Sequence, residues 1–384
     1  HKGVKWQDIA PVNGRAFTSA DVACTLDHIK QTPGAVQAGL MSVVDNVETP
    51  DDNTAVFHLN TAFAAFDQSV ASYNMEIIPC EADRGEYDLK TTAIGTGPFI
   101  LSDWNKTVSM TYTKNPTYFI AGVPHLDKVQ LLIMADTAAQ IAAYRTKQLD
   151  ILSPTDQQLD SVLGTNGDSL VRTQTQLTMT QVMMNQTAKP FDDVRVRKAV
   201  AMSWDRKGMG DTFYYDYTLG SAYPATLLGG MTAEESDEAW PYDPEGAKKL
   251  LAEAGFPNGL DVELTVTDGY GATIVNQAQW FQQDLEKVGI HATIKQLDYA
   301  TYAANVLTNK AAYTIAYGYS SGLASPDEWL TSFYKSGSTR NSFGTADPKL
   351  DQMIDEQRGI LDTDERAAKL HEIAEYIAEN VVSP

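Results

Sequence analysis

Residues 185–206 read NQTAKPFDDVRVRKAVAMSWDR and join an extended segment to a helix near the middle of the chain. Upstream of this stretch, residues 169–185 alternate apolar and polar side chains with few exceptions, which is the period of a β-strand. Pro190 ends the strand, and Asp192 and Asp193 offer capping oxygens and negative charge at a helix start. We therefore expect one long strand that crosses once between two lobes, with a helix directly after it.

The helix expected after this strand has an apolar face and a solvated flank. Side chains that we expect to be buried recur at helical spacing: Val196, Ala199, Val200 and Ser203. Three basic residues fall on the flank, where we expect them to be at least partly exposed: Arg195, Arg197 and Lys198. This pattern is typical of a helix that packs one side on a core.

The composition is that of a globular protein with a strongly acidic balance. The 384 residues are 43% hydrophobic and 21% charged, which is enough for two domains with buried cores. Lys and Arg number 29 against 50 Asp and Glu, and the formal net charge is -21. A negative charge of this size repels polyanions, so we expect neither a nucleic-acid partner nor binding to anionic membrane surfaces.

The two cysteines, Cys24 and Cys80, leave two interpretations open. They form one disulfide in an oxidising compartment, or they are two buried free thiols. The sequence contains no run of about 18 apolar residues, so it shows neither a membrane-spanning helix nor a signal peptide.

The first lobe, expected at residues 1–176, is predicted to combine a helix with antiparallel hairpins. The helix covers residues 20–30 and is capped by Thr18 or Ser19. The first predicted hairpin joins strands 43–47 and 55–59 by a loop longer than two residues. The second joins strands 99–104 and 108–112, with Val108, Met110 and Tyr112 pointing inward. A βαβ unit follows, with strand 129–134, helix 137–146 and strand 150–152.

The second lobe, expected at residues 177–384, has a more regular pattern. Strands and helices alternate at its centre, which predicts a βαβαβ unit: strand 262–266, a helix whose apolar stripe runs from Ile274 to Val288, strand 290–297, helix 299–307 and strand 313–317. Further helices are expected to begin at Pro244 and to lie near residues 327–334, 348–358 and 364–379. The expected fold class is therefore α/β, with mixed α+β regions.

Five ordered stretches together resemble one protein family. They are residues 2–21 (KGVKWQDIAPVNGRAFTSAD), 95–119 (GTGPFILSDWNKTVSMTYTKNPTYF), 185–206, 242–259 (YDPEGAKKLLAEAGFPNG) and 362–379 (DTDERAAKLHEIAEYIAE). Residues 185–206 are similar to the signature "N…PFdDvRVRkAiamAiDR" of that family. The family is the extracytoplasmic solute-binding proteins of ABC importers, family 5, which includes oligopeptide, dipeptide and nickel binders.

This resemblance implies a bilobed periplasmic-binding-protein fold with a ligand cleft between two lobes. It implies a monomer, anchored as a lipoprotein or free, in the periplasm or on the extracellular face of the cytoplasmic membrane. Such a protein captures a peptide or other small solute, passes it to an ABC permease and catalyses no reaction. Because the chain opens at His1 inside a family motif and stops at Pro384 after a helix that does not end the family, we expect a fragment lacking both termini.

The ligand site is expected in the loop after strand 313–317, because ligands of open α/β sheets bind beyond the carboxyl ends of strands. The expected ligand-binding residues are Tyr317, Tyr319, Ser320, Ser321 and Gly322. Tyr319 falls at a position that resembles a cleft-facing Trp of the family, where an aromatic ring can stack on a ligand. A structural tyrosine at the end of a strand is the alternative.

Gly322, in this loop, and Asp327, just after it, are expected to have different roles. Dipeptide-binding relatives carry an acidic residue that pairs with the amino terminus of the ligand, and here that position resembles Gly322. An amine anchor is therefore expected to be absent. Asp327 follows Pro326 at a helix start, and we expect it to cap that helix rather than to contact a ligand.

Other functional classes have weaker signals. Residues 318–322 spell G-x-S-x-G, as in a hydrolase with Ser320 as nucleophile and His371 as base, but an elbow needs a helix directly after the serine. A secreted, chaperone-like binder is a further alternative. The six histidines have no zinc-binding spacing, and neither a P-loop nor a dinucleotide fingerprint is present, so no metal and no cofactor are expected.

Overall fold

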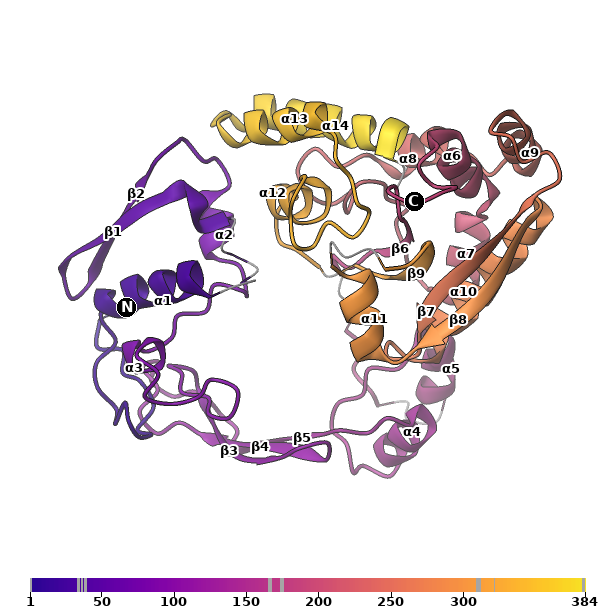
Figure 1. Cartoon of the computed structure of the whole chain (residues 1–384). Helices are drawn as coiled ribbons and strands as arrows, with labels where there is room; N and C mark the ends of the chain where they lie inside the picture. Colours follow the sequence, from indigo (N-terminus) through magenta and orange to yellow (C-terminus); the bar gives the residue numbers. More distant parts are fainter. Residues whose placement is uncertain are drawn as a thin grey trace. The chain divides into compact units, whose positions relative to one another are not determined.

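A computed structural model describes residues 2–32, 35, 37, 40–164, 168–172, 176–308, 312–320, 322–381 and 384 (Figure 1). The chain forms two compact units: unit 1 is His1–Thr61 with Tyr73–Ser169, and unit 2 is Ala62–Ser72 with Leu170–Pro384. The chain therefore passes between the units after residues 61, 72 and 169, and the expectation of a single crossing is wrong. That the lobes meet at residue 176 stays a prediction.

The first helix of unit 1 is α1 (Ser19–Gln31), and of the two predicted caps it is Thr18 that occupies the N-cap position. Asp21 completes a capping box that the sequence analysis did not predict. The first hairpin pairs β1 (Val44–Asp51) with β2 (Thr54–Leu59). The predicted longer loop is wrong, because Asp51 pairs with Thr54 and only two residues connect the strands. The Asp51 carboxylate accepts a bond of 2.8 Å from the backbone N–H of Asn53, which stabilises this tight turn.

The second sheet of unit 1 is antiparallel, in the order β3 (Phe99–Asn105), β4 (Ser109–Lys114) and β5 (Lys128–Leu132). Helices α4 (Thr137–Arg145) and α5 (Asp156–Leu163) follow. The predicted βαβ unit is wrong, since β5 pairs antiparallel with β4 and residues 150–152 form no strand. The continuous apolar run at residues 129–134 misled the prediction, since Leu131 is 47% exposed. Val108, which the alternation in residues 108–112 predicted to point inward, is 53% exposed, so that prediction is wrong too.

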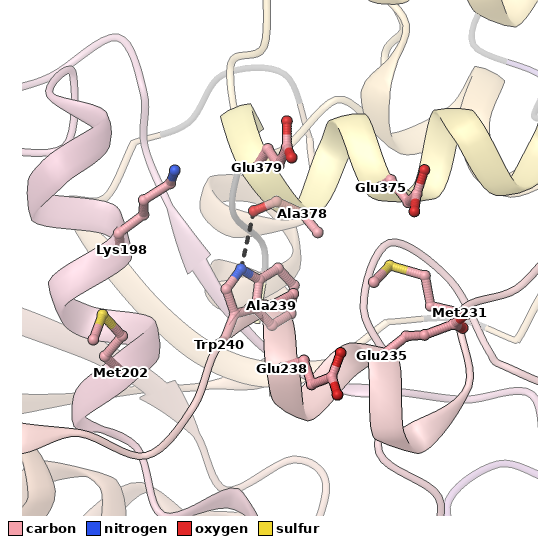
Figure 2. A pocket seen from close by; sticks show the side chains of 10 residues that line it. All are labelled: Lys198, Met202, Met231, Glu235, Glu238, Ala239, Trp240, Glu375, Ala378 and Glu379. Atoms are coloured by element: carbon pink, nitrogen blue, oxygen red, sulfur yellow. Dashed lines mark hydrogen bonds between the residues drawn. The ribbon is translucent and has the colours of Figure 1, made fainter.

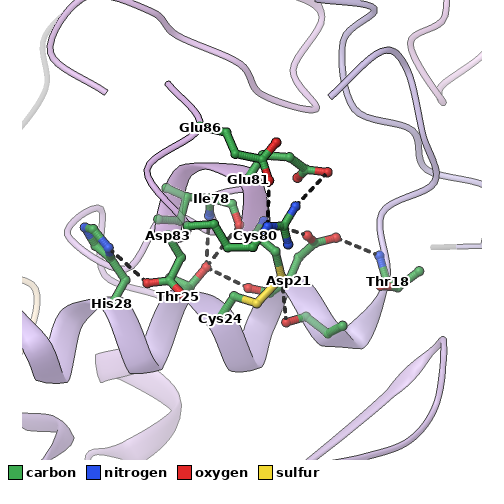
Figure 3. The surroundings of a disulfide bond; sticks show 12 residues. Thr18, Asp21, Cys24, Thr25, His28, Ile78, Cys80, Glu81, Asp83 and Glu86 are labelled. Atoms are coloured by element: carbon green, nitrogen blue, oxygen red, sulfur yellow. Dashed lines mark hydrogen bonds and ion pairs between the residues drawn. A yellow bond between two sulfur atoms is a disulfide. The ribbon is translucent and has the colours of Figure 1, made fainter. Parts of the chain in front are cut away.

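A covalent and ionic cluster joins α1 to the short helix α3 (Cys80–Asp83), as Figure 3 shows. Cys24 and Cys80 form a disulfide with a Cα–Cα distance of 5.4 Å, which decides between the two open interpretations. The buried carboxylate of Asp21 accepts bonds from Arg15 Nη2 at 2.6 Å and from Trp6 Nε1 at 3.1 Å. Arg15 also binds Glu81 at 2.5 Å, so one guanidinium holds two carboxylates.

Unit 2 is built on a four-stranded sheet in the order β6-β9-β7-β8. Strand β7 (Leu260–Thr267) is parallel to β8 (Ile290–Leu297) and to β9 (Ile315–Tyr319), and β9 is antiparallel to β6 (Thr180–Met184). Helices α10 (Ala272–Lys287) and α11 (Tyr299–Val306) connect the parallel strands, which confirms the predicted βαβαβ unit. Leu131 and Val266 lie in different sheets, as two separate lobes require.

Of the expected long strand at residues 169–185, the described residues form only β6, and residues 173–175 lie outside the described part. Pairing begins at Thr180 opposite Tyr319, where β9 ends. Alternation is a property of the sequence, but a strand also needs a partner for its backbone groups. Leu170, in the upstream part of the segment, is 76% exposed.

The two connecting helices cover opposite faces of the sheet. Phe281 of α10 stacks on Tyr317 with ring centroids 5.8 Å apart. On the other face, the Tyr302 hydroxyl of α11 donates to the Tyr317 carbonyl at 3.1 Å. A Cβ at Gly318 would collide with that hydroxyl, so the glycine allows α11 to approach the strand. Opposite faces are the arrangement that right-handed crossovers on both sides of β7 produce.

Helix α6 (Val194–Ser203) is the helix predicted after Pro190, and Asp193 caps it by accepting from the Arg195 N–H at 2.8 Å. The predicted apolar face, Val196, Ala199, Val200 and Ser203, is fully buried. Lys198 is half-buried, as expected. The expected exposure of Arg197 is wrong: this side chain is 6% exposed and donates to the carbonyls of Phe191 and Asn380.

Unit 2 contains further helices, of which α13 and α14 lie side by side in Figure 1. They are α2 (Phe66–Val70), α7 (Arg206–Phe213), α8 (Ala233–Ala239), α9 (Pro244–Glu253), α12 (Pro326–Trp329) with the π-helix Leu330–Tyr334, α13 (Pro348–Arg358), and α14 (Thr363–Tyr376) with the π-helix Ile377–Val381. The Ala64 N–H donates to the Arg358 carbonyl at 2.8 Å, which attaches residues 62–72 to unit 2. In the described part of the chain, no helix is long and apolar enough to cross a membrane.

The role predicted for Asp327 is wrong. Ser325 is the N-cap of α12, because its hydroxyl accepts from the Glu328 N–H at 3.2 Å. Asp327 is fully buried and accepts from Arg358 Nε at 2.8 Å and Gln357 Nε2 at 2.7 Å. Its carboxylate therefore ties α12 to α13, a long-range role that local sequence does not reveal.

Candidate functional site

Aromatic side chains meet at the carboxyl ends of the parallel strands in unit 2. Tyr319 ends β9, Tyr270 follows β7, and Tyr299 begins α11 directly after β8. The Tyr270 ring lies 5.2 Å from the Tyr319 ring and 5.4 Å from the Tyr299 ring, centroid to centroid. We call these three residues, together with Thr180, Tyr214 and Gln277, the aromatic edge. Its position is the one where open α/β sheets bind ligands.

A hydrogen-bond network supports the aromatic edge from α10. Gln277 Nε2 donates to the Tyr214 hydroxyl at 2.7 Å, and Thr180 Oγ1 lies 3.3 Å from the same oxygen. Gln277 is fully buried, and its Oε1 has no partner among the described residues. The Tyr214 hydroxyl is therefore held by side chains of β6 and α10.

The tyrosine hydroxyl groups of the aromatic edge are protonated and uncharged at neutral pH. Burial raises the pKa of Tyr319, and the neighbouring Tyr214 and Tyr270 raise it further. Burial likewise raises the pKa of Tyr270, followed by the effect of Tyr299. These phenols therefore stay protonated at neutral pH, and each offers one donor and one acceptor beside an apolar ring face.

Among the predicted site residues, Tyr319 lies at the aromatic edge and is half-buried. Tyr317 does not reach the surface: its ring is fully buried between Trp204 and Phe281, each 5.8 Å away. Its hydroxyl contacts Met209 Sδ at 3.0 Å. Tyr317 lies two residues before the end of β9, where helices α6, α7 and α10 cover this face of the sheet. We therefore remove Tyr317 from the candidate site.

The rest of the predicted loop carries no hydrolase geometry. Ser320 is 4% exposed, and its hydroxyl donates to the Met179 carbonyl at 3.2 Å. The next described helix begins only at Pro326, and His371 Nε2 lies 3.6 Å from a Glu235 carboxylate oxygen on another part of the unit. Gly322 is half-buried, and Ser321 lies outside the described residues.

Sequence reasoning did not select four other members of the aromatic edge: Thr180, Tyr270, Gln277 and Tyr299. Tyr270 could have been found, because it follows strand β7 in DGYG and the loops after parallel strands converge at one sheet edge. Gln277 could not, since it lies within the apolar stripe of a helix. Tyr214 belongs to an aromatic run at residues 213–223, but its contact with α10 depends on the fold.

Elsewhere in unit 2 lies an acidic pocket of about 370 Å³, shown in Figure 2. Its lining residues come from α6, α8, α14 and nearby turns: Lys198, Met202, Met231, Glu235, Glu238, Ala239, Trp240, Glu375, Ala378 and Glu379. Trp240 Nε1 donates to the Ala378 carbonyl at 2.9 Å. None of these residues lies at a strand end. Among the described residues no group of three or more His, Cys, Asp or Glu is placed to hold a metal ion.

Comparison with known proteins gives one family match and several relatives. The family model for bacterial extracellular solute-binding proteins, family 5 Middle, matches residues 1–341. The glutathione-binding protein GsiB of Pectobacterium atrosepticum is 28% identical over 308 residues, which are 80% of this chain and 58% of that protein. GsiB of Escherichia coli K12 is 28% identical over 309 residues, 79% of this chain and 58% of that protein. The chain thus spans less than two thirds of the length of these relatives.

Solved structures show the same fold. The periplasmic binding protein DppA from Helicobacter pylori, in complex with the peptide STSA, has a TM-score of 0.86 and 22% identity, and the match covers 100% of this chain and 78% of that chain. MoaA from A. tumefaciens R10, in complex with mannopinic acid, has a TM-score of 0.85 and 26% identity over 99% and 77% of the two chains. The expected fold class, mixed α/β of the periplasmic-binding-protein type, is confirmed.

Proposed function

The chain belongs to the bacterial extracellular solute-binding proteins of family 5, and we propose that it is the substrate-binding component of an ABC transporter. In this role it captures a peptide or other small solute and delivers it to a membrane permease. It binds its ligand without catalysing a reaction. The proposed location is the periplasm or the extracellular face of the cytoplasmic membrane, with or without a lipid anchor, and the proposed form is a monomer.

The aromatic edge is the observation that carries this proposal. It places the ring centroids of Tyr319 and Tyr270 5.2 Å apart, at the end of the sheet where ligands of this fold class bind. Half-buried rings with hydroxyl groups supply apolar contact area and a few oriented hydrogen bonds, which is what a small-solute site needs. Ser320 lacks the surroundings of a nucleophile, so the site supports binding rather than hydrolysis.

Two further observations agree with an extracellular binding protein. The Cys24–Cys80 disulfide is typical of oxidising compartments. Relatives with a range of ligands share the family or the fold: GsiB is named for glutathione, and the structures of DppA and MoaA contain a peptide and mannopinic acid. This range supports a small polar solute but does not select one.

The test is to identify the ligand directly. The chain is purified without denaturation, and native mass spectrometry records any bound small molecule, which is then released and fragmented. Glutathione, the peptide STSA and mannopinic acid are titrated in parallel by calorimetry. We expect one bound solute of defined mass, or saturable binding of at least one probe. A chain that is folded by circular dichroism, retains no solute and binds none of the probes contradicts the proposal.

Transport distinguishes an importer component from a chaperone-like secreted binder. Deleting the gene in the source organism should abolish uptake of the radiolabelled ligand, and expressing the gene again should restore it. Unchanged uptake, with the ligand still bound by the purified protein, would favour the chaperone-like alternative.

A further inference from the structure

The sequence contains two motifs of the form Asn-x-Ser/Thr without a central proline, at residues 105–107 (NKT) and 185–187 (NQT). In extracytoplasmic proteins this pattern marks asparagines to which an oligosaccharide can be attached. Bacterial oligosaccharyltransferases also select Asp or Glu two residues before the asparagine, because the carboxylate makes a charge-assisted contact with the enzyme. Asp103 meets this requirement for the first motif, whereas Met183 stands at that position before the second. Residues 103–107 therefore have the complete acceptor pattern.

The first motif lies at the tip of the hairpin that joins β3 to β4 in unit 1 (Figure 1). Asn105 is the last residue of β3 and pairs with Ser109, so the loop consists of residues 106–108. All residues from 103 to 108 are exposed. The side chain of Asn105 has no hydrogen-bond partner among the described residues. Its Nδ2 is therefore free to react, and an enzyme can enclose this loop without unfolding the sheet.

The second motif is closed to modification in the folded chain. Asn185 is 5% exposed, and its Nδ2 donates to the Tyr313 carbonyl at 3.0 Å. Its Oδ1 accepts from the Thr187 N–H at 3.0 Å and from the Thr187 hydroxyl at 2.7 Å. Both polar atoms of this amide and the hydroxyl of the motif are thus used inside unit 2. Asn185 provides an internal control for Asn105.

The backbone of Thr107 gives an independent reason to assign a role to the first motif. Its φ is 69°, in the left-handed region. Three-residue hairpin loops favour glycine at such a position, because a β-branched residue is strained there. The Thr107 hydroxyl has no hydrogen-bond partner among the described residues, so the hairpin gains no bond from threonine. A residue that the turn disfavours and whose hydroxyl is unused is explained if an external partner recognises that hydroxyl.

We propose that Asn105 is an N-glycosylation site, with a polyprenyl-diphosphate-linked oligosaccharide as the donor and an oligosaccharyltransferase as the catalyst. Nδ2 of Asn105 forms a bond to the anomeric carbon of the first sugar and loses one proton. The bond between that carbon and a diphosphate oxygen breaks, and polyprenyl diphosphate leaves with the bonding electrons. The site requires the extracytoplasmic location that belongs to the proposed function, but neither solute binding nor transport.

Transfer in vitro to the folded, disulfide-bonded chain tests the acceptor. The chain is incubated with a membrane-embedded bacterial oligosaccharyltransferase and its polyprenyl-diphosphate-linked oligosaccharide, and intact mass spectrometry records the product. We expect one added oligosaccharide, which peptide mapping places on Asn105, and an unmodified Asn185. Asn105→Gln should abolish the transfer. Asp103→Asn removes one charge-assisted contact with the enzyme and should slow the transfer about tenfold.

Variants within the loop separate recognition by the enzyme from folding. Thr107→Gly removes the hydroxyl and suits the left-handed backbone, so the transfer should be lost while the melting temperature stays close to that of the wild type. Thr107→Ser keeps the hydroxyl and should retain the transfer. Lys106→Gln is the matched control: it introduces the central residue of the second motif and should be modified like the wild type, because exposure rather than this residue distinguishes the motifs.

Protein isolated from the source organism gives the deciding measurement. We expect its peptide with residues 103–107 to carry an oligosaccharide on Asn105. An unmodified Asn105 in that protein, or a chain that accepts the oligosaccharide only after unfolding, overturns the inference. If Asn105 is unmodified but the chain retains and transports a solute, the proposed function stands alone. If Asn105 is modified but no solute is retained or transported, the glycosylation site stands and the proposed function fails.

Discussion

Nη2 of Arg197 donates a hydrogen bond of 2.5 Å to the carbonyl oxygen of Asn380, 183 residues later in the chain. Its Nη1 donates to the Phe191 carbonyl at 2.8 Å. One buried guanidinium thus ties helix α6 to the segment after α14 and to the turn that precedes α6. Burial lowers the pKa of Arg197, although the nearby Asp193 and Asp192 oppose this effect.

Replacing Arg197 by methionine should lower the free energy of unfolding of unit 2 by about 2 to 4 kcal/mol, because the buried carbonyl of Phe191 and the partly buried carbonyl of Asn380 lose their donor. Urea unfolding followed by tryptophan fluorescence measures the change. Arg195→Met is the matched control on the same helix: its ion pair with Asp193 is exposed, and its loss should cost about 0 to 1 kcal/mol. Equal losses for the two variants would show that the Arg197 bonds do not contribute.

A charge introduced on the apolar face of α6 should lower the stability of unit 2 far more than the removal of a charge from the flank of the same helix. Val196 is fully buried, so Val196→Asp introduces an unpaired buried carboxylate and should destabilise unit 2 by several kcal/mol. Lys198 is half-buried at the acidic pocket, and Lys198→Ala should change stability by less than about 1 kcal/mol. Melting temperatures from differential scanning calorimetry compare the two, and similar shifts would contradict the assigned face.

Removing the disulfide should destabilise unit 1. Cys24 and Cys80 are 56 residues apart, and a closed loop of this size restricts the unfolded chain by about 4 kcal/mol. Cys24→Ala combined with Cys80→Ala should therefore lower the unfolding free energy of unit 1 by about 2 to 5 kcal/mol. Limited proteolysis can assign the loss to this unit, because cleavage should increase in residues 1–61 and 73–169. Uniform protection in both units would argue against a stabilising role.

Low pH should reduce the stability of unit 1, because ion-paired carboxylates become protonated. Hydrogen bonding from Arg15 holds the pKa of Glu81 below its ordinary value of 4.5, despite partial burial. A carboxylate with a depressed folded pKa stabilises the protein above its unfolded pKa, and this stabilisation is lost as the pH falls through the folded value. The unfolding free energy should therefore decrease below about pH 4.5, and less steeply in Glu81→Gln, which starts from a lower stability. Parallel curves for wild type and variant between about pH 6 and about pH 2 would exclude this contribution.

Tyr319 should carry affinity for the solute that co-purifies with the chain. Removing an aromatic ring from a binding site commonly costs about 1 to 4 kcal/mol, so Tyr319→Ala should weaken binding at least about fivefold. Ser320→Ala should have little effect, since its hydroxyl is bonded to the Met179 carbonyl. Tyr215→Ala, at a ring that is 58% exposed, is the aromatic control. If calorimetry shows unchanged affinity for folded Tyr319→Ala, the solute does not contact this residue.

The sequence by itself determined the helices and strands that are specified by hydrophobic periodicity and by capping residues close to them in the chain. The alternation of strands and helices gave the βαβαβ unit of unit 2, and residues 190–203 gave the position, cap and buried face of α6. These inferences needed only the periods of helices and strands and the chemistry of caps. The strand expected at residues 313–317 is shifted by two residues in the structure, so Tyr319, expected in the loop, is the last residue of β9. Its role in ligand binding stays a prediction.

Tertiary structure alone decided which groups meet across long separations. The burial of Arg197 depends on a carbonyl 183 residues away, and the tyrosines of the aromatic edge meet only after β7, β8 and β9 align. The start of β6 was fixed by the point where its partner β9 ends, and Tyr317 was buried by helices that pack on it from other segments. Sequence periodicity reports which faces prefer burial, but the partners that satisfy a backbone group, a guanidinium or a phenol are chosen by the fold.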